Sequence, residues 1–176
     1  MRKIGLSLLL ACLMTTGTAM AEKRPRNIIF MIGDGMGLAQ VTAALRANNN
    51  QLNFERLPVL GLSKTYSASH IVTDSGAGGT ALSSGCKTNN SMVGMNADSV
   101  PVESLLTESQ RHGLSTGVVV TCCLTHATPA AFLAHNINRK NYEDIAVDVA
   151  HSKADVMIGG GRLHFDQRKD GANYVD

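Results

Sequence analysis

Ser115–Cys123, with the sequence STGVVVTCC, is the stretch that decides the fold class. Its valines, threonine and cysteines are typical of a strand buried inside a sheet. An amphipathic helix is predicted just before it, over Val102–His112, and Gly113 is a natural carboxyl-terminal cap. After it, a helix is predicted over Tyr142–Ser152 and a further strand over Ala154–Ile158. The centre of the chain therefore alternates between strand and helix.

The same alternation extends toward the amino terminus. Asn27–Gly33 (NIIFMIG) is a nearly continuous apolar run and predicts a strand buried on both faces. A helix follows over Gly37–Asn48, a strand over Val59–Tyr66 and a small-residue helix over Ser75–Ser84. This repetition indicates an α/β fold with a mainly parallel sheet covered by helices. In such sheets, active sites collect beyond the carboxyl ends of the strands.

The first 21 residues have the layout of a secretory signal peptide. Arg2 and Lys3 precede an apolar run, Ile4–Met14, and small residues end in Ala-Met-Ala at Ala21. We therefore expect cleavage after Ala21 and a secreted or periplasmic protein. The apolar run is too short for the roughly 20 residues that span a bilayer. The box LLAC, which ends at Cys12, leaves a lipid anchor as the alternative.

The mature chain is globular in composition and close to neutral. Hydrophobic residues make up 44% and charged residues 17% of the chain. Removal of residues 1–21 leaves 14 basic and 14 acidic side chains, since only Arg2 and Lys3 are lost. No long basic run survives, which argues against a nucleic-acid or anionic-membrane surface. The remaining cysteines, 86, 122 and 123, are odd in number and predict no disulfide framework.

The motif GDGMG, residues 33–37, lies where the first predicted strand ends and a helix begins. Its glycines permit a sharp turn and place the carboxylate of Asp34 at the strand tip. Asp34 is therefore a candidate metal ligand, and a helix cap is the alternative interpretation. A dinucleotide-binding motif fits badly, because its third glycine would fall at Leu38.

The motif VTDSGAGGTA, residues 72–81, places Ser75 at the start of the small-residue helix. Unpaired N–H groups at a helix start favour an anion such as phosphate, and small neighbours leave room for substrate and metal ions. An Asp-Ser cap of a glycine-rich helix is the alternative. The G-x-S-x-G motif of other serine hydrolases is absent, since Thr73 stands at its first glycine.

The motif THATPAA, residues 125–131, follows the strand that ends at Cys123. His126 and Thr128 can both face one cation, and Arg139 can hold phosphate with two N–H groups. Each of them, taken alone, also fits a structural or surface role. The other histidines have no comparable context and are interpreted as packing or surface residues: His70, His112, His135, His151 and His164.

The three motifs in this order and spacing, together with ADVMIGGGR at residues 154–162, resemble the alkaline phosphatase family from about Arg26 to Gly161. The resemblance implies a three-layer αβα fold, present here in part, and a secreted phosphomonoesterase with two Zn²⁺ and one Mg²⁺. It implies that Ser75 is the nucleophile and that Arg139 binds the phosphate of small phosphomonoester substrates. Asp74 matches the residue that orients this arginine.

On the metal side, the resemblance implies that Asp34 bridges a zinc ion and the magnesium site, and that Ser75 also contacts zinc. His126 and Thr128 match residues on the magnesium side. Family members carry aspartate or histidine at the His126 position, and a histidine there makes the contact to magnesium indirect. The remaining ligands of the family lie downstream of anything present, and His164, Asp166 and Asp170 do not replace them. We therefore expect residues 22–176 to be the amino-terminal portion of one domain, inactive alone, whose full-length form can be a homodimer.

Two other functions fit parts of the sequence. Ser84-Gly85-Cys86-Lys87 has the S-x-x-K spacing of penicillin-recognising serine acylases, but Gly85 weakens the helix and the companion motifs are missing. A non-catalytic metal- or phosphate-binding relative is the second alternative. Phosphate release by the complete protein distinguishes it from an enzyme.

Overall fold

The computed structural model describes residues 25–175, so the predicted signal peptide and Cys12 lie outside the described residues. The chain divides into two units between Ile32 and Gly33. Residues 25–32 of the first unit form neither helix nor strand. Every helix and strand of the described part belongs to the second unit. No helix among the described residues is long and apolar enough to cross a membrane.

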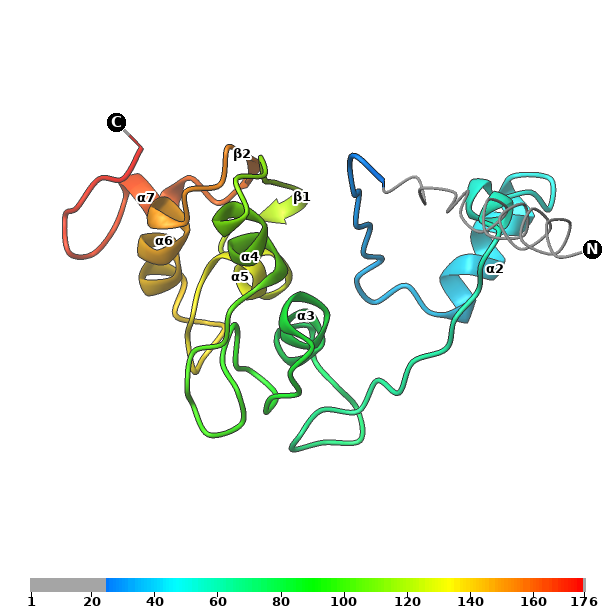
Figure 1. Ribbon diagram of the computed structural model, residues 1–176, viewed down its shortest axis with the longest axis horizontal. Coiled ribbons are helices and arrows are strands. Elements are labelled where there is room, and N and C mark those ends of the chain that lie inside the picture. The colour runs from blue at the N-terminus through cyan, green and yellow to red at the C-terminus, as the bar shows by residue number, and fades with distance from the viewer. Residues whose placement is uncertain (1–24, 176) are drawn as a thin grey trace, which may run out of the picture. The chain divides into compact units, whose positions relative to one another are not determined.

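The second unit contains mostly helices and one pair of strands (Figure 1). In chain order these are α2 (Leu38–Ala47), the 3-10 helix η1 (Asn53–Arg56), α3 (Ser75–Ser84), α4 (Leu105–Arg111), β1 (Gly117–Cys123), α5 (Ala127–Leu133), α6 (Tyr142–His151), β2 (Val156–Gly160) and α7 (Leu163–Asp166).

Strands β1 and β2 pair in parallel, with α5 and α6 in the connection between them. Gly117 is opposite Val156, and the register slips before Cys123 meets Gly160. A parallel pair needs such a helical crossover, so this is the βαβ unit that the alternating pattern predicts.

One face of this small sheet packs on the hydrophobic core. Val118 and Met157 contact the core, whereas Val119 is 70% and Ile158 is 58% exposed on the strands. The core side chains come from α4 to α7 and the loop before α4: Val93, Leu106, Ala127, Ala130, Ala131, Leu133, Ala134, Ile145, Ala146, Val149 and Phe165. The core therefore holds α5 and α6 against the strands and fixes the loop where β1 meets α5.

Two predicted strands do not form. Residues 27–33 and 59–66 take part in no sheet in the described part of the chain, and their apolar side chains are exposed except that of Ile32, which is half-buried. Ile29 is 86% and Leu62 is 99% exposed. A strand needs a neighbour that pairs with its N–H and C=O groups, so an apolar run alone does not make one.

Other element boundaries shift for local reasons. The helix predicted from Val102 begins at Leu105, because the hydroxyl of Ser104 accepts the N–H of Thr107 as its cap. Gly113 has φ 71°, as its predicted capping role requires. The strand predicted over Ala154–Ile158 begins two residues later, at Val156, and the carboxylate of Asp155 accepts the N–H of Thr116, the residue before β1. Helices α5 and α7 were not predicted.

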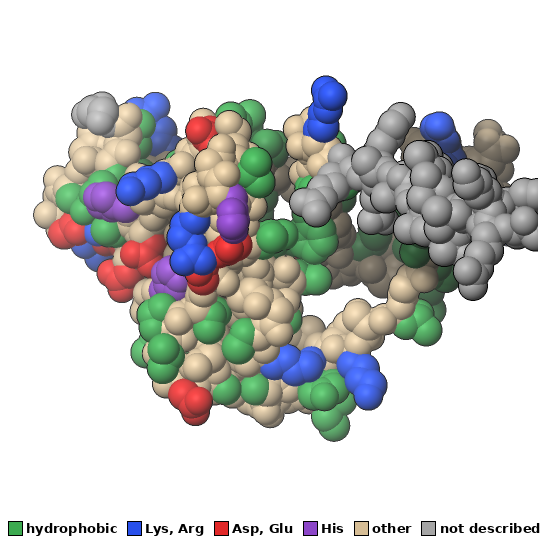
Figure 2. All heavy atoms as spheres, viewed as in Figure 1, with side chains coloured by type: hydrophobic (Ala, Val, Ile, Leu, Met, Phe, Trp, Pro, Cys, Tyr) green, Lys and Arg blue, Asp and Glu red, His purple; other side chains and the backbone are tan. Residues whose placement is uncertain are grey.

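Charged side chains of both signs are interspersed over α4 to α7 on the face shown in Figure 2. Histidines lie among them, and the basic side chains of that face do not gather into one patch. This distribution agrees with the equal numbers of basic and acidic side chains in residues 22–176.

Candidate active site

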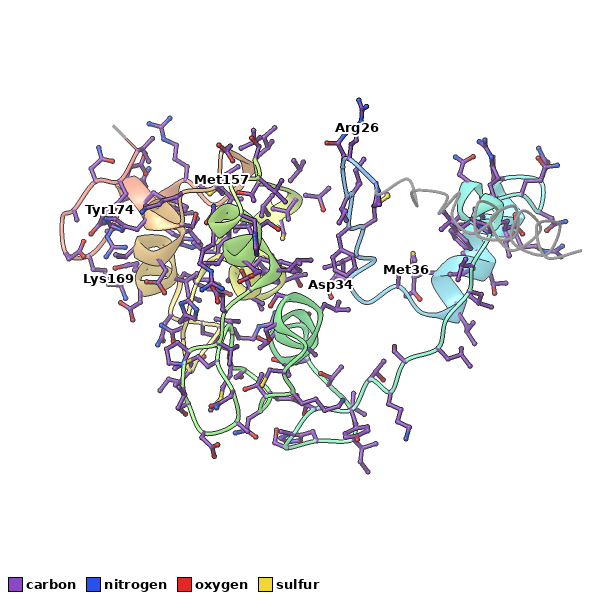
Figure 3. All side chains as sticks on the ribbon, viewed as in Figure 1. Arg26, Asp34, Met36, Met157, Lys169 and Tyr174 are labelled. Carbon is purple, nitrogen blue, oxygen red and sulfur yellow. The ribbon has the colours of Figure 1, made fainter. Side chains whose placement is uncertain are left out.

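Asp34 stands at the centre of the contacts between the three sequence motifs. It lies in a turn closed by a hydrogen bond from the N–H of Met36 to the C=O of Gly33, and Gly35 takes the left-handed backbone (φ 66°) that this turn needs. Its Oδ1 accepts a hydrogen bond from the Ser75 hydroxyl at 3.0 Å. Its Oδ2 accepts one from the Thr128 hydroxyl at 2.5 Å. Figure 3 labels Asp34 beside α3.

Ser75 is the first residue of α3, as predicted. Asp74 is the N-cap, and its Oδ1 accepts the N–H of Ala77 at 2.9 Å. The helix therefore starts where the sequence places it, and the Ser75 hydroxyl lies at the positive end of the helix dipole.

Helix α3 packs closely on α5 because its residues are small. A side chain on Gly79 would put its Cβ 3.1 Å from the Cβ of Ala131, and the Ser83 hydroxyl donates to the C=O of Ala131 at 2.7 Å. Both contacts are buried. They hold the two helices together beyond their first turns, so that Ser75 and Thr128, near the starts of α3 and α5, reach the same carboxylate.

Arg139 forms an ion pair with Asp74, the residue before Ser75. The Arg139 Nη1 is 3.1 Å from the Asp74 Oδ2, and their side chains are 20% and 25% exposed. Burial alone would raise the pKa of Asp74. The N–H of Ala77, the Arg139 guanidinium and the N–H of Ser91 outweigh burial and hold this pKa below its usual value. Asp74 is therefore a carboxylate at neutral pH and an anchor for the guanidinium.

His126 occupies the N-cap position of α5, two residues before Thr128. Its Nδ1 is buried and has no hydrogen-bond partner. A buried nitrogen without a partner is costly unless something binds it. The Asp34 carboxylate and the hydroxyls of Ser75 and Thr128 are oxygen donors of the kind that divalent cations bind, and the His126 Nδ1 is a candidate further donor. Among residues 25–175, however, no group of three His, Cys, Asp or Glu side chains could hold a metal ion alone.

Residues 25–176 match the family described as alkaline phosphatase. The chain belongs to the alkaline phosphatase family. It is 38% identical over 177 residues to alkaline phosphatase 4 of Bacillus subtilis strain 168, which takes in 90% of this chain and 38% of that protein. It is 32% identical over 206 residues to the alkaline phosphatase of Gadus morhua, with 88% of this chain and 43% of that protein covered.

Solved alkaline phosphatases share the fold. The enzyme of the Antarctic bacterium TAB5 matches with a TM-score of 0.78 and 39% identity, over 81% of this chain and 42% of that one. The cold-active enzyme of a psychrophilic Shewanella matches with a TM-score of 0.71 and 45% identity, over 77% of this chain and 36% of that one. These likenesses confirm the predicted α/β, alkaline-phosphatase-like fold. The chain spans about two fifths of the length of these relatives.

Ser84 and Lys87 do not form the Ser-Lys pair of penicillin-recognising serine acylases. The Ser84 hydroxyl donates to the C=O of Thr80, and α3 ends there because Gly85 is left-handed (φ 71°). The Lys87 ammonium donates to the C=O of Lys64 and lies 3.8 Å from the centre of the Tyr66 ring. Ser84 and Lys87 therefore contact different residues and not each other.

His164, Asp166 and Asp170 contact residues outside the candidate active site. His164 bonds to the Thr125 hydroxyl at 2.7 Å and stacks on Tyr142, and burial lowers its pKa. Asp166 pairs with Arg162 at 2.5 Å. Asp170 pairs with Arg168, also at 2.5 Å. None of these contacts includes Asp34, Ser75 or Arg139.

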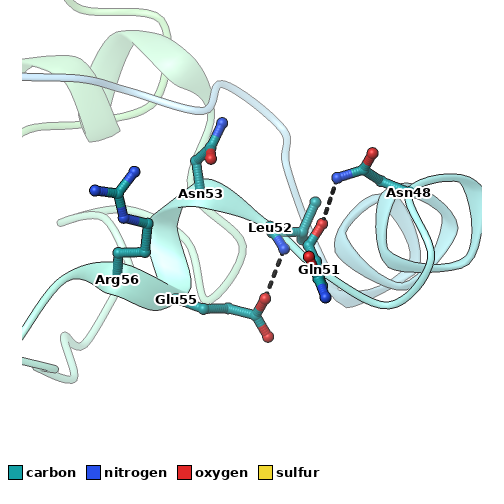
Figure 4. A pocket seen from close by; sticks show the side chains of 6 residues that line it. All are labelled: Asn48, Gln51, Leu52, Asn53, Glu55 and Arg56. Carbon is teal, nitrogen blue, oxygen red and sulfur yellow. Dashed lines mark hydrogen bonds between the residues drawn. The ribbon is translucent and has the colours of Figure 1, made fainter.

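A surface hollow of about 300 Å³ lies next to η1 (Figure 4). Its lining is mostly polar, and Glu55 uses its carboxylate to cap the N–H of Leu52. None of the predicted site residues lines it. The hollow is therefore separate from the candidate active site.

The sequence analysis missed two residues that contact the site. The Asn90 side chain bonds to the backbone at Asp74, and the N–H of Ser91 bonds to the Asp74 carboxylate. The available signal was the polar run Asn-Asn-Ser between two predicted helices, since asparagine and serine favour turns that bond to nearby backbone. Helix α5 was missed as well, although Pro129 lies in its first turn, where proline is tolerated.

Proposed function

We propose that the protein is an exported, metal-dependent phosphomonoesterase that works through a phosphoserine at Ser75, and that this chain is its amino-terminal part. The observation that carries the proposal is the Ser75 hydroxyl at the start of α3, 3.0 Å from the Asp34 carboxylate and next to the Asp74–Arg139 ion pair. A nucleophile, an anion-binding helix start and a bidentate cation are the parts that phosphoryl transfer needs.

In the proposed reaction, the Ser75 oxygen attacks the phosphorus in line with the ester oxygen. The bond from phosphorus to Ser75 forms, the ester bond breaks, and the alcohol leaves with a proton. Water then attacks the phosphoserine, releases inorganic phosphate and returns a proton to Ser75. The Arg139 guanidinium donates to two non-bridging oxygens and complements their charge in the transition state. Asp74 keeps the guanidinium in place.

The metal ions would be held by Asp34, by the two hydroxyls that bond to it, and by His126, two residues before Thr128. Asp34 and Ser75 would hold zinc, and Asp34, Thr128 and His126 would hold the magnesium side. Bound divalent cations lower the pKa of a coordinated hydroxyl and offset charge on the attacking and leaving oxygens. Two histidine variants of the TAB5 enzyme, one with aspartate and one with glutamate, contain Mg in a site called M3. This supports one magnesium ion besides the two zinc ions of the proposal.

Replacing Ser75 tests the nucleophile. In the parent protein, Ser75→Ala removes the oxygen that forms the phosphoester, so we expect no phosphoserine to be trapped at low pH by mass spectrometry. Turnover of p-nitrophenyl phosphate should fall by orders of magnitude. Ser84→Ala is the matched control, because Ser84 bonds only within its own helix end. Full turnover by Ser75→Ala would remove Ser75 from this role.

Export is proposed from the layout of the first 21 residues. The intact mass of the mature protein tests it, with Glu22 expected as the first residue. A diacylated Cys12 would replace soluble export by a lipid anchor.

A further inference from the structure

We infer that Asn90 and Ser91 form a positioning turn that sets the distance between Ser75 and Arg139. The inference rests on the proposed function, because it concerns the same nucleophile and the same phosphate-binding side chain. Neither residue would touch substrate. Their contacts reach the backbone on both sides of the site.

Asn90 holds the backbone that leads into α3. Its Oδ1 accepts the N–H of Asp74 at 3.2 Å, and its Nδ2 donates to the C=O of Val72 at 3.0 Å. Its own N–H donates to the Ser69 hydroxyl at 3.0 Å. One amide side chain thus clamps both ends of the short segment that precedes Ser75.

Ser91 connects this clamp to Arg139. Its N–H donates to the Asp74 Oδ2 at 3.0 Å, and its C=O accepts the N–H of Arg139 at 2.7 Å. Arg139 therefore has two links to the start of α3. One is the ion pair with Asp74, and the other is the backbone bond to Ser91.

The backbone of Ser91 is strained. Its φ is 76°, in the left-handed region that a residue with a side chain rarely adopts. Such strain persists where the surrounding contacts over-determine the conformation, and it concentrates at functional sites. Here the contacts that fix it are the bonds to Asp74 and Arg139.

The turn also lies directly against α3. A Cβ on Gly76 would be 2.8 Å from the carbonyl oxygen of Met92 and 3.4 Å from the carbonyl carbon of Ser91. Further along, Val93 pairs with Asn136 through two hydrogen bonds of 2.9 Å, three residues before Arg139. The turn is thus packed between the helix that carries the nucleophile and the loop that carries the guanidinium.

A double-mutant cycle on phosphate binding tests this role. We would titrate the full-length protein with inorganic phosphate in zinc- and magnesium-containing buffer and follow the amide signals of Ser75 and Arg139 by NMR, which detects millimolar affinities. Asn90→Ala should weaken phosphate binding about tenfold. This is the loss expected when positioning of the site loses the net free energy of about one hydrogen bond. In an Arg139→Ala background, Asn90→Ala should weaken phosphate binding less than about twofold, because Asn90 acts by positioning Arg139.

Asn89→Ala is the matched control. Asn89 is the neighbouring asparagine, and its side chain donates to the C=O of Ala97 and to the sulfur of Met92 but not to Asp74 or Arg139. Asn89→Ala should bind phosphate as tightly as the unsubstituted protein. Ser91→Gly should also bind like the parent, because glycine adopts a positive φ without cost. Ser91→Val should weaken binding as Asn90→Ala does, since a branched side chain disfavours that conformation.

Each outcome decides between the proposals. Phosphate binding that is unchanged in Asn90→Ala and Ser91→Val overturns the positioning turn and leaves the proposed function standing. A loss of the same size in both backgrounds, or a loss of the cooperative thermal transition in Asn90→Ala but not in Asn89→Ala, shows a structural role and also overturns it. If the full-length protein binds no phosphate at these amides, both proposals fall together.

Discussion

His126 carries the clearest chemical consequence at the scale of single residues. Its Nδ1 is buried without a partner, two residues from the Thr128 hydroxyl that bonds to Asp34. Magnesium is a hard cation and prefers oxygen to imidazole nitrogen. In the proposed magnesium site, the side chain at this position would therefore set how directly magnesium is bound.

Replacing this imidazole by a carboxylate should favour magnesium. We expect His126→Asp to bind Mg²⁺ at least about tenfold more tightly than the parent, because one more anionic oxygen joins Asp34 and Thr128. Isothermal titration calorimetry with MgCl₂ measures this. His135→Asp is the control, since the backbone N–H of His135 bonds to Asp148 outside the site. An unchanged or weaker affinity of His126→Asp would contradict the magnesium assignment.

Asp74 makes stability depend on pH. The pKa of Asp74 is lower in the folded chain than its ordinary value of 3.8, so the carboxylate favours folding above about pH 4, and this contribution disappears as the pH falls through the folded pKa. In metal-free buffer, Asp74→Asn should therefore be less stable than the parent at pH 7, and the gap should narrow below about pH 4. Urea unfolding at several pH values measures the gap. A gap that stays constant to pH 2 contradicts the ion-pair account.

At the scale of elements, the glycines of α3 have different tasks. Gly79 faces Ala131 of α5, whereas a Cβ on Gly78 would meet only the Thr73 side chain at 3.8 Å. Close packing of α3 on α5 therefore requires a glycine at position 79. At position 78 there is room for a side chain.

A matched pair of valine substitutions tests this division. Gly79→Val should destabilise the chain by about 1–3 kcal/mol more than Gly78→Val, because it over-packs the contact between α3 and α5. Both changes have the same intrinsic effect on the helix, so the difference in thermal unfolding isolates packing. Equal destabilisation would mean that α3 does not approach α5 as closely as the structure shows.

Local signals predicted most of the elements that form, with α5 and α7 missed, whereas the two predicted strands that do not form lack a pairing partner. Helix α3 and strand β1 follow from caps and apolar runs inside their own sequence. Residues 27–33 and 59–66 have equally apolar sequences but no sheet partner in the described part of the chain. The sequence of one segment does not show whether a strand is available to pair with it, because pairing depends on two segments.

At the scale of the whole molecule, the sequence predicted the family and the meeting of its motifs. Asp34, Ser75 and Thr128 come from three segments far apart in the chain, and hydrogen bonds join them. Their order and spacing resemble a known family, which pattern reasoning can recognise. The supporting turn at Asn90 and Ser91 could not be predicted, since its role arises from a left-handed backbone and contacts across the fold.

The partial length of the chain has a measurable consequence. Because the described residues contain no complete metal-ligand group, we expect zinc to raise the thermal midpoint of the 176-residue chain only slightly, and hydrolysis of p-nitrophenyl phosphate to be close to background. A strong zinc-dependent shift, or robust hydrolysis by the purified chain, would show that this chain suffices alone.

A crystal structure of the parent protein with orthovanadate tests most directly whether the site binds one phosphoryl group. We predict vanadium in contact with the Ser75 oxygen, the Arg139 guanidinium donating to two vanadate oxygens, and Asp34 on the metal side of the same group. Vanadate bound away from the start of α3, or an Arg139 that still contacts only Asp74 while vanadate is bound elsewhere, would contradict the account.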